Sequence, residues 1–182
     1  MMNLHKLWLG LVVWLLAGCT TVMQSTSGPV PLATQAKWAI LPMVNNTDTP
    51  QAGLSAEAML EHQLRMHGIQ DVAHYPASMT RDSLFEPTER KVTEEAQKWA
   101  QDQGVRYGVL GSVEEWRYKV GIDGEPAVGV TIKVLDLSSG QVVWSASGAK
   151  SGWSRQALSA VAQNLLTELM AGLRLGAQPQ AL

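Results

Sequence analysis

The side chains that could carry catalysis or hold a metal are few, and their spacing suits neither task. His62 and His67 lie five residues apart, which places them on different faces of a helix, and His74 stands alone in the sequence. Glu114 and Glu115 are adjacent in a predicted strand, where consecutive side chains point to opposite faces and cannot form an acid–base pair. The chain has no G-x-S-x-G elbow and no phosphate-binding glycine loop. We therefore expect no metal site, no cofactor and no enzyme.

Cys19 is the only cysteine of the chain, so it cannot form an internal disulfide. It follows a weakly cationic start and an apolar run over 7–17, which is too short to span a bilayer but is typical of a secretory signal. The LAGC motif at residues 16–19 resembles the lipobox of bacterial lipoproteins. It predicts a lipid on the Cys19 sulfur and cleavage of a signal peptide at 1–18. An ordinary signal peptide with a chance cysteine is the alternative.

The residues after the cysteine predict where the protein goes and how it is held. Thr20 occupies a position where lipoproteins retained in the inner membrane commonly carry Asp, so we expect the periplasmic face of the outer membrane. Each buried lipid methylene contributes about 0.8 kcal/mol, and two acyl chains already anchor a protein stably. Residues 19–35 are rich in Ser, Thr, Pro and Gly and predict a lipidated, flexible tether. A single periplasmic domain over 36–176 and a C-terminal tail over 177–182 follow.

The charge of the chain limits its partners. The 182 residues include 14 Lys and Arg and 16 Asp and Glu, and removal of residues 1–18 takes away one lysine. The mature chain then has 13 basic residues against 16 acidic ones, a net charge of −3. This mild negative charge argues against nucleic acid, which favours a basic patch, and is compatible with a cationic ligand where the acids cluster.

Apolar periodicity predicts the elements that position these residues. We expect a buried strand over 37–44, a short strand over 69–74, and helices over 54–67 and 88–103 that end at Gly68 and Gly104. Strands over 107–120, 128–134 and 142–146 predict a three-stranded meander. A final helix, capped by Ser154, has an apolar face of Leu158, Val161, Ala162, Leu165 and Leu169. The predicted fold is α+β, with a mixed or antiparallel sheet and the helices packed on one of its faces.

Two residues have plain structural explanations. Asp123 precedes Gly124, and Asp-Gly favours a two-residue type I′ hairpin turn, which by itself accounts for the aspartate. Trp153 precedes the predicted cap Ser154, where its indole could staple onto Leu158.

Residues 107–155 resemble the PelC family, outer-membrane lipoproteins of the bacterial Pel exopolysaccharide export machinery. The most specific pieces are EWRYKVGIDGEPAVGV and WSASGAKSGWSR, and the lipobox agrees with them. AILPMVNNT and DLSSGQVVW are shared more widely, with a lipoprotein superfamily that includes the curli secretion pore and TolB-like domains. Residues 66–91 add little to the match.

The resemblance implies a role that needs no catalysis. PelC-like proteins form a dodecameric ring on the periplasmic face of the outer membrane, beneath the β-barrel of PelB. Their electronegative funnel is regarded as guiding the cationic Pel polymer toward that barrel, since a ring of carboxylates concentrates a polycation. Asp123 matches the acidic position of the funnel, and Trp153 matches the aromatic residue that faces the membrane.

Two other classes remain as alternatives. A curli-type lipoprotein makes its own pore from hairpins of about 9–11 alternating residues per strand, and the hairpin over 119–128 offers Lys119, Asp123 and Glu125 instead. An adaptor lipoprotein that activates a cell-wall synthase needs a long disordered tether, and the predicted tether is short.

Overall fold

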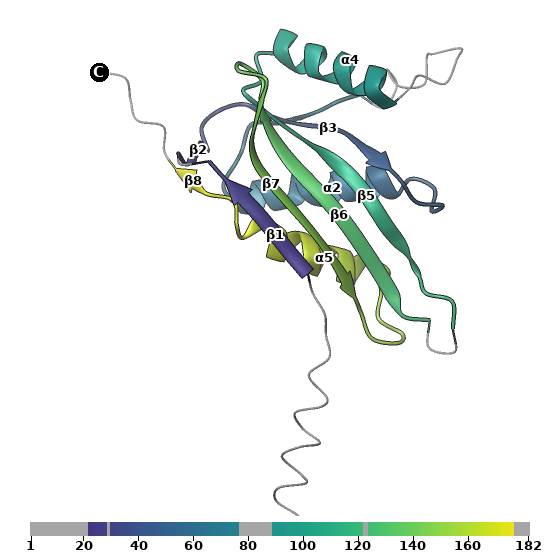
Figure 1. Ribbon diagram of the computed structural model, residues 1–182. Coiled ribbons are helices and arrows are strands. Elements are labelled where there is room, and N and C mark those ends of the chain that lie inside the picture. The colour runs from purple at the N-terminus through teal and green to yellow at the C-terminus, as the bar shows by residue number, and fades with distance from the viewer. Residues whose placement is uncertain (1–21, 29, 77–88, 122–123, 177–182) are drawn as a thin grey trace, which may run out of the picture.

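The computed structural model describes residues 22–28, 30–76, 89–121 and 124–176 (Figure 1). Two of the three predicted site residues, Cys19 and Asp123, lie outside the described residues. The predicted signal peptide and C-terminal tail lie outside them as well.

A six-stranded mixed sheet forms the centre of the domain. Its order is β1 (Val22–Ser27), β7 (Gln141–Ser151), β6 (Pro126–Asp136), β5 (Tyr107–Tyr118), β3 (Trp38–Asn45) and β4 (Val72–His74). β5, β6 and β7 are antiparallel neighbours and confirm the predicted meander, whereas β3 and β4 run parallel to β5. A small separate sheet pairs β2 (Leu32–Ala33) with β8 (Leu175–Gly176). The α+β class is confirmed.

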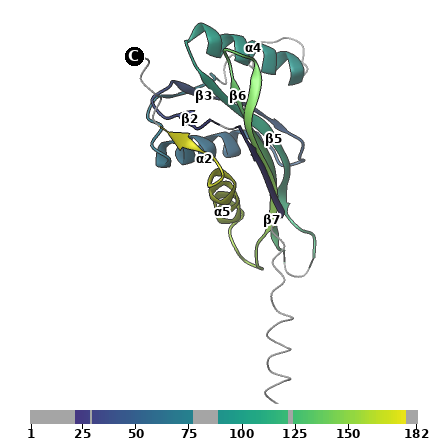
Figure 2. The same cartoon turned by 60° about the vertical axis from the view of Figure 1, so that its left-hand side comes forward.

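Within the part of the chain that the structure describes, three helices cover this sheet: α2 (Ala52–Met66), α4 (Glu89–Asp102) and α5 (Leu158–Met170). α2 and α5 lie on the same side of the sheet (Figure 2), where they bury the main core with Trp38 and Ile40 of β3. α4 packs instead against Ala39 and Leu41, which point to the other face. The expectation that all helices share one face is therefore wrong for α4, because β3 is apolar on both faces and each face needs a cover.

The last helix begins later than the sequence predicts. Its N-cap is Ala157, which is extended and makes no side-chain cap hydrogen bond, so the predicted cap at Ser154 is wrong. Arg155 has a left-handed φ of 68°, which a right-handed helix cannot contain. The predicted apolar face is confirmed, since Val161, Ala162, Leu165 and Leu169 are buried against the sheet and Leu158 packs at its margin.

Part of the predicted tether is a strand. β1 pairs antiparallel with β7, with Val22 opposite Ala149 and Ser27 opposite Trp144. The expectation of a flexible segment over 19–35 is therefore wrong for residues 22–27. An open sheet edge offers a full row of hydrogen bonds, and these can order even a segment rich in serine and threonine.

The hairpin between β5 and β6 is present. Tyr118 lies opposite Pro126, and the N–H of Lys119 donates to the carbonyl oxygen of Glu125 at 2.7 Å. Residues 122 and 123 lie outside the described residues, so the predicted turn at Asp123-Gly124 stays a prediction.

Candidate functional site

Trp153 lies in the connection between β7 and α5, and 70% of its surface is exposed. Its backbone N–H donates to Oε1 of Gln156 at 3.1 Å, which closes the connection on itself. A hydrophobic staple requires the tryptophan directly before the N-cap, but Ala157 is the N-cap and Gln156 precedes it. The staple onto Leu158 is therefore wrong, and the indole is free to meet another surface.

Gly152 sets the path of this connection. Its N–H donates to the carbonyl oxygen of Pro126 at 2.8 Å. A Cβ at this position would lie 2.5 Å from Oε1 of Gln156 and 2.5 Å from Cγ2 of Val161, so only glycine fits. The close approach holds Trp153 beside the β5–β6 hairpin.

Two side chains at the end of β5, where the hairpin turn begins, bond to the same connection. The Tyr118 hydroxyl accepts the N–H of Leu158 at 3.0 Å and donates to the carbonyl oxygen of Gln156 at 3.4 Å. Lys119 Nζ donates to Oγ of Ser151 at 2.7 Å. The structure thus places the Trp153 connection against the hairpin that contains Asp123, although the two are far apart in the sequence.

This end of the domain exposes apolar and cationic side chains together. Val120 is fully exposed, Tyr118 is half exposed, and the indole of Trp153 is open to solvent. Lys119 and Arg155 are also exposed here. Figure 1 shows the hairpin and the β7–α5 connection at the end of the sheet away from α4, and β1 begins at the same end.

The outer face of β5, the one that points away from α2 and α5, carries two carboxylates where the sequence predicts one. A bulge between Val113 and Glu115 inserts Glu114 as an extra residue opposite Gly129. A Cβ at Gly129 would lie 3.5 Å from that of Glu115 and 3.7 Å from that of Glu114, so both glutamates share this face. The prediction that they point to opposite faces is wrong, because strict alternation fails at a bulge.

The two glutamates have different partners. Hydrogen bonds from the Ser112 hydroxyl and then the Asn46 amide lower the pKa of Glu114, against a smaller opposing effect of burial. Glu115 accepts from Arg117 at 3.1 Å. Glu114 is therefore negative at neutral pH, and no basic side chain among the described residues pairs with it. The charge of Glu115, in contrast, is balanced by Arg117.

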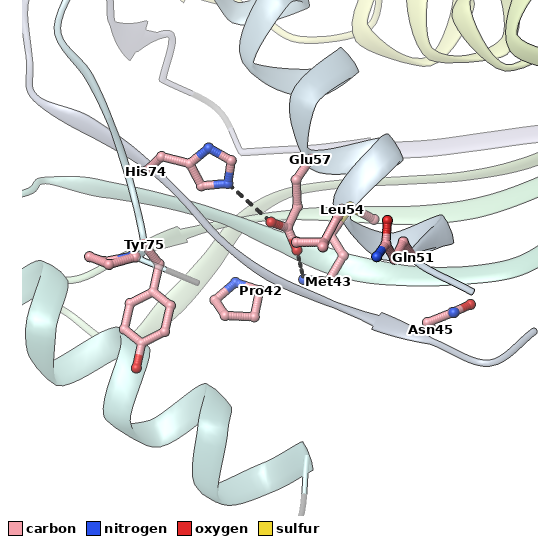
Figure 3. A pocket seen from close by; sticks show the side chains of 10 residues that line it. Pro42, Met43, Asn45, Gln51, Leu54, Glu57, His74 and Tyr75 are labelled. Carbon is pink, nitrogen blue, oxygen red and sulfur yellow. Dashed lines mark hydrogen bonds and ion pairs between the residues drawn. The ribbon is translucent and has the colours of Figure 1, made fainter. Parts of the chain in front are cut away.

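A hollow lies at the β3 and β4 edge of the sheet, beside the start of α2 (Figure 3). Glu57 is buried at its wall: Oε1 accepts the N–H of Met43 at 2.8 Å, and Oε2 contacts Nε2 of His74 at 3.0 Å. Nδ1 of His74 lies 3.5 Å from a carboxylate oxygen of Glu61. The hydrogen bond to Glu57 raises the pKa of His74 above the usual 6.5, and burial offsets part of this rise.

The sequence gives no local sign of this pairing. His74 stands alone in it, and Glu57 lies next to the apolar stripe of its helix. Within the described part of the chain, no group of three or more His, Cys, Asp or Glu side chains is arranged to hold a metal ion. The described helices include none with the length and apolar character needed to cross a bilayer.

These features define an α+β domain that exposes apolar and cationic side chains together at one end. No family model matches the chain, and no curated protein does. A solved lipoprotein of Neisseria meningitidis, GNA1162, has the same fold at 17% identity, covering 75% of this chain and 96% of its own, with a TM-score of 0.55. At this identity the likeness shows a shared fold.

Two further structures are much more similar. The PelC dodecamer of Paraburkholderia phytofirmans is 43% identical over 86% of this chain and 99% of its own, with a TM-score of 0.73. A variant of that dodecamer in another crystal form gives 43% identity, the same coverage of this chain and a TM-score of 0.74. The chain belongs to the PelC family, which confirms the resemblance seen in residues 107–155. Membership also agrees with the expectation that it is not an enzyme.

Proposed function

We propose that this protein is a lipid-anchored member of a Pel export system that forms a dodecameric ring on the periplasmic face of the outer membrane. The ring guides the cationic exopolysaccharide electrostatically to the PelB barrel. The observation that carries the proposal is the 43% identity to a PelC dodecamer over 86% of the chain. Neither cofactor nor metal has a part in it.

The start of β1 supports the orientation. Val22 lies opposite Ala149, close to the end of β7 that leads into the Trp153 connection. Cys19 precedes Val22 by three residues, and an extended chain advances about 3.3 Å per residue, so about 10 Å separate them at most. A lipid on Cys19 therefore holds this end of the domain against the membrane. The same short distance argues against an adaptor that reaches far from the membrane.

The side chains at this end suit a lipid surface. Tryptophan combines an apolar body with one N–H donor and is enriched at the boundary of water and lipid. We propose that Trp153 makes this contact, with Val120 beside it. Lys119 and Arg155 place positive charge at the level of the lipid phosphates.

The acidic residue of the funnel is Asp123 in this proposal. A flexible polycation meets the same carboxylate once per subunit, so the symmetry of the ring multiplies a modest attraction. Glu114, which remains negative, adds to the negative potential of the outer face of the sheet. Attraction of this kind is screened over about 8 Å at physiological salt.

Polymer export at matched protein levels tests the proposal. Asp123→Asn keeps the size of the side chain and removes one charge from every subunit, so export is expected to fall while assembly persists. In a binding assay with purified ring and polymer, raised salt should reproduce the loss. Export and binding that are insensitive to both changes would contradict the proposal.

The structure also decides which aspartate serves as the control. Asp136 is buried and paired with Arg106 at 2.8 Å; although burial opposes ionisation, hydrogen bonds from Ser138 and Arg106 lower the pKa of Asp136. Asp136→Asn therefore disturbs the fold and is unsuitable. Asp102 is exposed at the end of α4, a helix that lies at the end of the sheet away from the hairpin (Figure 1). It is the matched control, and Asp102→Asn should leave export unchanged.

A further inference from the structure

The hollow beside the start of α2 has no part in the proposed membrane contact or funnel. It has a volume of about 670 Å³ and lies between the end of β3, the first turns of α2 and the residues after β4. Its walls are mainly apolar and include Met43, Leu54 and Tyr75. Leu54 is 43% exposed, which is unusual for a large aliphatic side chain in a concave surface.

The polar groups of the hollow are mostly occupied within the chain. Both carboxylate oxygens of Glu57 are already bonded, one to Met43 and one to His74. The Asn45 amide bonds within its own loop, to Thr47 and Thr49. A small polar ligand such as a sugar needs several convergent donors and acceptors, and this hollow does not offer them. It suits apolar side chains.

The edge of the sheet at this hollow is closed to strand addition. β4 pairs with β3 only as far as Ile40, and beyond that point Pro42 has no N–H to offer. The carboxylate of Glu57 takes the N–H of Met43. A partner therefore meets this edge through side chains rather than by extending the sheet.

A closed ring of identical subunits needs two different surfaces on each chain, one at each side, because every contact is head to tail. The hollow lies at the β3 and β4 side of the domain, and the β1 and β2 side lies across the sheet from it (Figure 1). That side exposes Val30, which is 68% accessible, beside the exposed Arg174. An apolar projection and an apolar hollow thus occupy opposite sides of one chain.

We propose that the hollow is the socket of the subunit contact and receives the β1–β2 side of the next copy, with Val30 packed against Leu54. The occupant is a second copy because the family assembles as dodecamers and the hollow lacks the polar groups of a ligand site. The inference rests on the ring of the proposed function, but it concerns assembly and not polymer guidance.

The mass of the detergent-extracted, full-length assembly provides the first test. Leu54→Asp puts a charge in the apolar socket, and an acid in the first turn of α2 is favourable for the helix, so the fold survives. The midpoint of assembly should move to at least about tenfold higher protein concentration. Met66→Asp, the same change at an exposed residue at the end of α2, should leave the mass unchanged.

Cysteine cross-linking provides the second test, since the sulfur of Cys19 is taken up by lipid. Leu54→Cys and Val30→Cys, co-expressed as separate chains, should give a dimer on a non-reducing gel, and the double variant a ladder. Neither single variant alone should cross-link, because a head-to-tail contact never brings two copies of the same residue together.

The outcomes separate the two proposals. A wild-type chain that is monomeric overturns the proposed function. A wild-type dodecamer that keeps its mass with Leu54→Asp, or a co-expressed pair that gives no dimer, overturns the socket and leaves polymer guidance standing.

Discussion

The hydroxyl of Tyr118 lies 3.0 Å from the backbone nitrogen of Leu158 and accepts its hydrogen bond, which ties the β5–β6 hairpin to the first residue of α5. α5 has no side-chain cap of its own, because its N-cap is Ala157. A tyrosine from a neighbouring strand therefore satisfies the N–H of the first helical residue, one of the first-turn donors that have no partner within the helix.

Tyr118→Phe removes this acceptor and leaves the ring in place. We expect the free energy of unfolding to fall by about 1 kcal/mol, the usual cost of losing a helix cap, as measured by urea denaturation. A further consequence is local: the amide of Leu158 should exchange its hydrogen faster. Equal unfolding midpoints and unchanged exchange would show that water replaces the hydroxyl at no cost.

Trp153→Ala should weaken membrane binding and spare the fold. Because the indole is 70% exposed, its loss should change the free energy of unfolding by less than about 0.5 kcal/mol. The measurement is co-sedimentation of the assembled chain, produced without residues 1–19, with phospholipid vesicles. Val142→Ala, at an exposed residue beside the β6–β7 turn, is the control. Equal vesicle binding by wild type and both variants would remove Trp153 from the membrane contact.

The pairing of His74 with Glu57 and Glu61 predicts a pH dependence of stability. The pKa of His74 is raised in the folded chain, so the imidazolium contributes stability below the ordinary value of 6.5, and this contribution is lost as pH rises through the folded pKa. The imidazole is 37% exposed, which limits the effect to about 0.5 kcal/mol. The measurement is urea denaturation of wild type and His74→Gln between pH 5.5 and pH 8.5, values chosen to bracket the ordinary pKa. The free energy of unfolding should decline with rising pH in the wild type alone.

Two glutamate variants check the cause of that effect. Glu57→Gln retains an oxygen for the N–H of Met43 but removes the charge, so it should flatten the pH profile at modest cost in stability. Glu57→Ala leaves the N–H without its acceptor and should cost about 2 kcal/mol at every pH. If wild type, His74→Gln and Glu57→Gln all show the same dependence of unfolding free energy on pH, the pairing of His74 with Glu57 is not the cause of that dependence.

Local patterns in the sequence determined much of this protein. The strands of the meander alternate strictly, as in Val128, Val130, Ile132 and Val134, and each of these side chains is buried in the core. Gly68 and Gly104 end their helices in the left-handed conformation that glycine accepts most readily. The family also followed from motifs in the meander and the connection after it. These features depend on neighbours within a few residues, which a single sequence shows directly.

Tertiary structure alone decided the contacts that set the site. The bulge that brings Glu114 and Glu115 to one face depends on the register of β5 against β6, and the connection before α5 is held by the hydrogen bond from Gly152 to Pro126. The second face of β3 gave α4 its place, and the free edge of β7 ordered β1. In each case the residues that meet lie far apart in the chain. Their pairing is settled by packing and hydrogen bonding of whole elements, and no local periodicity encodes it.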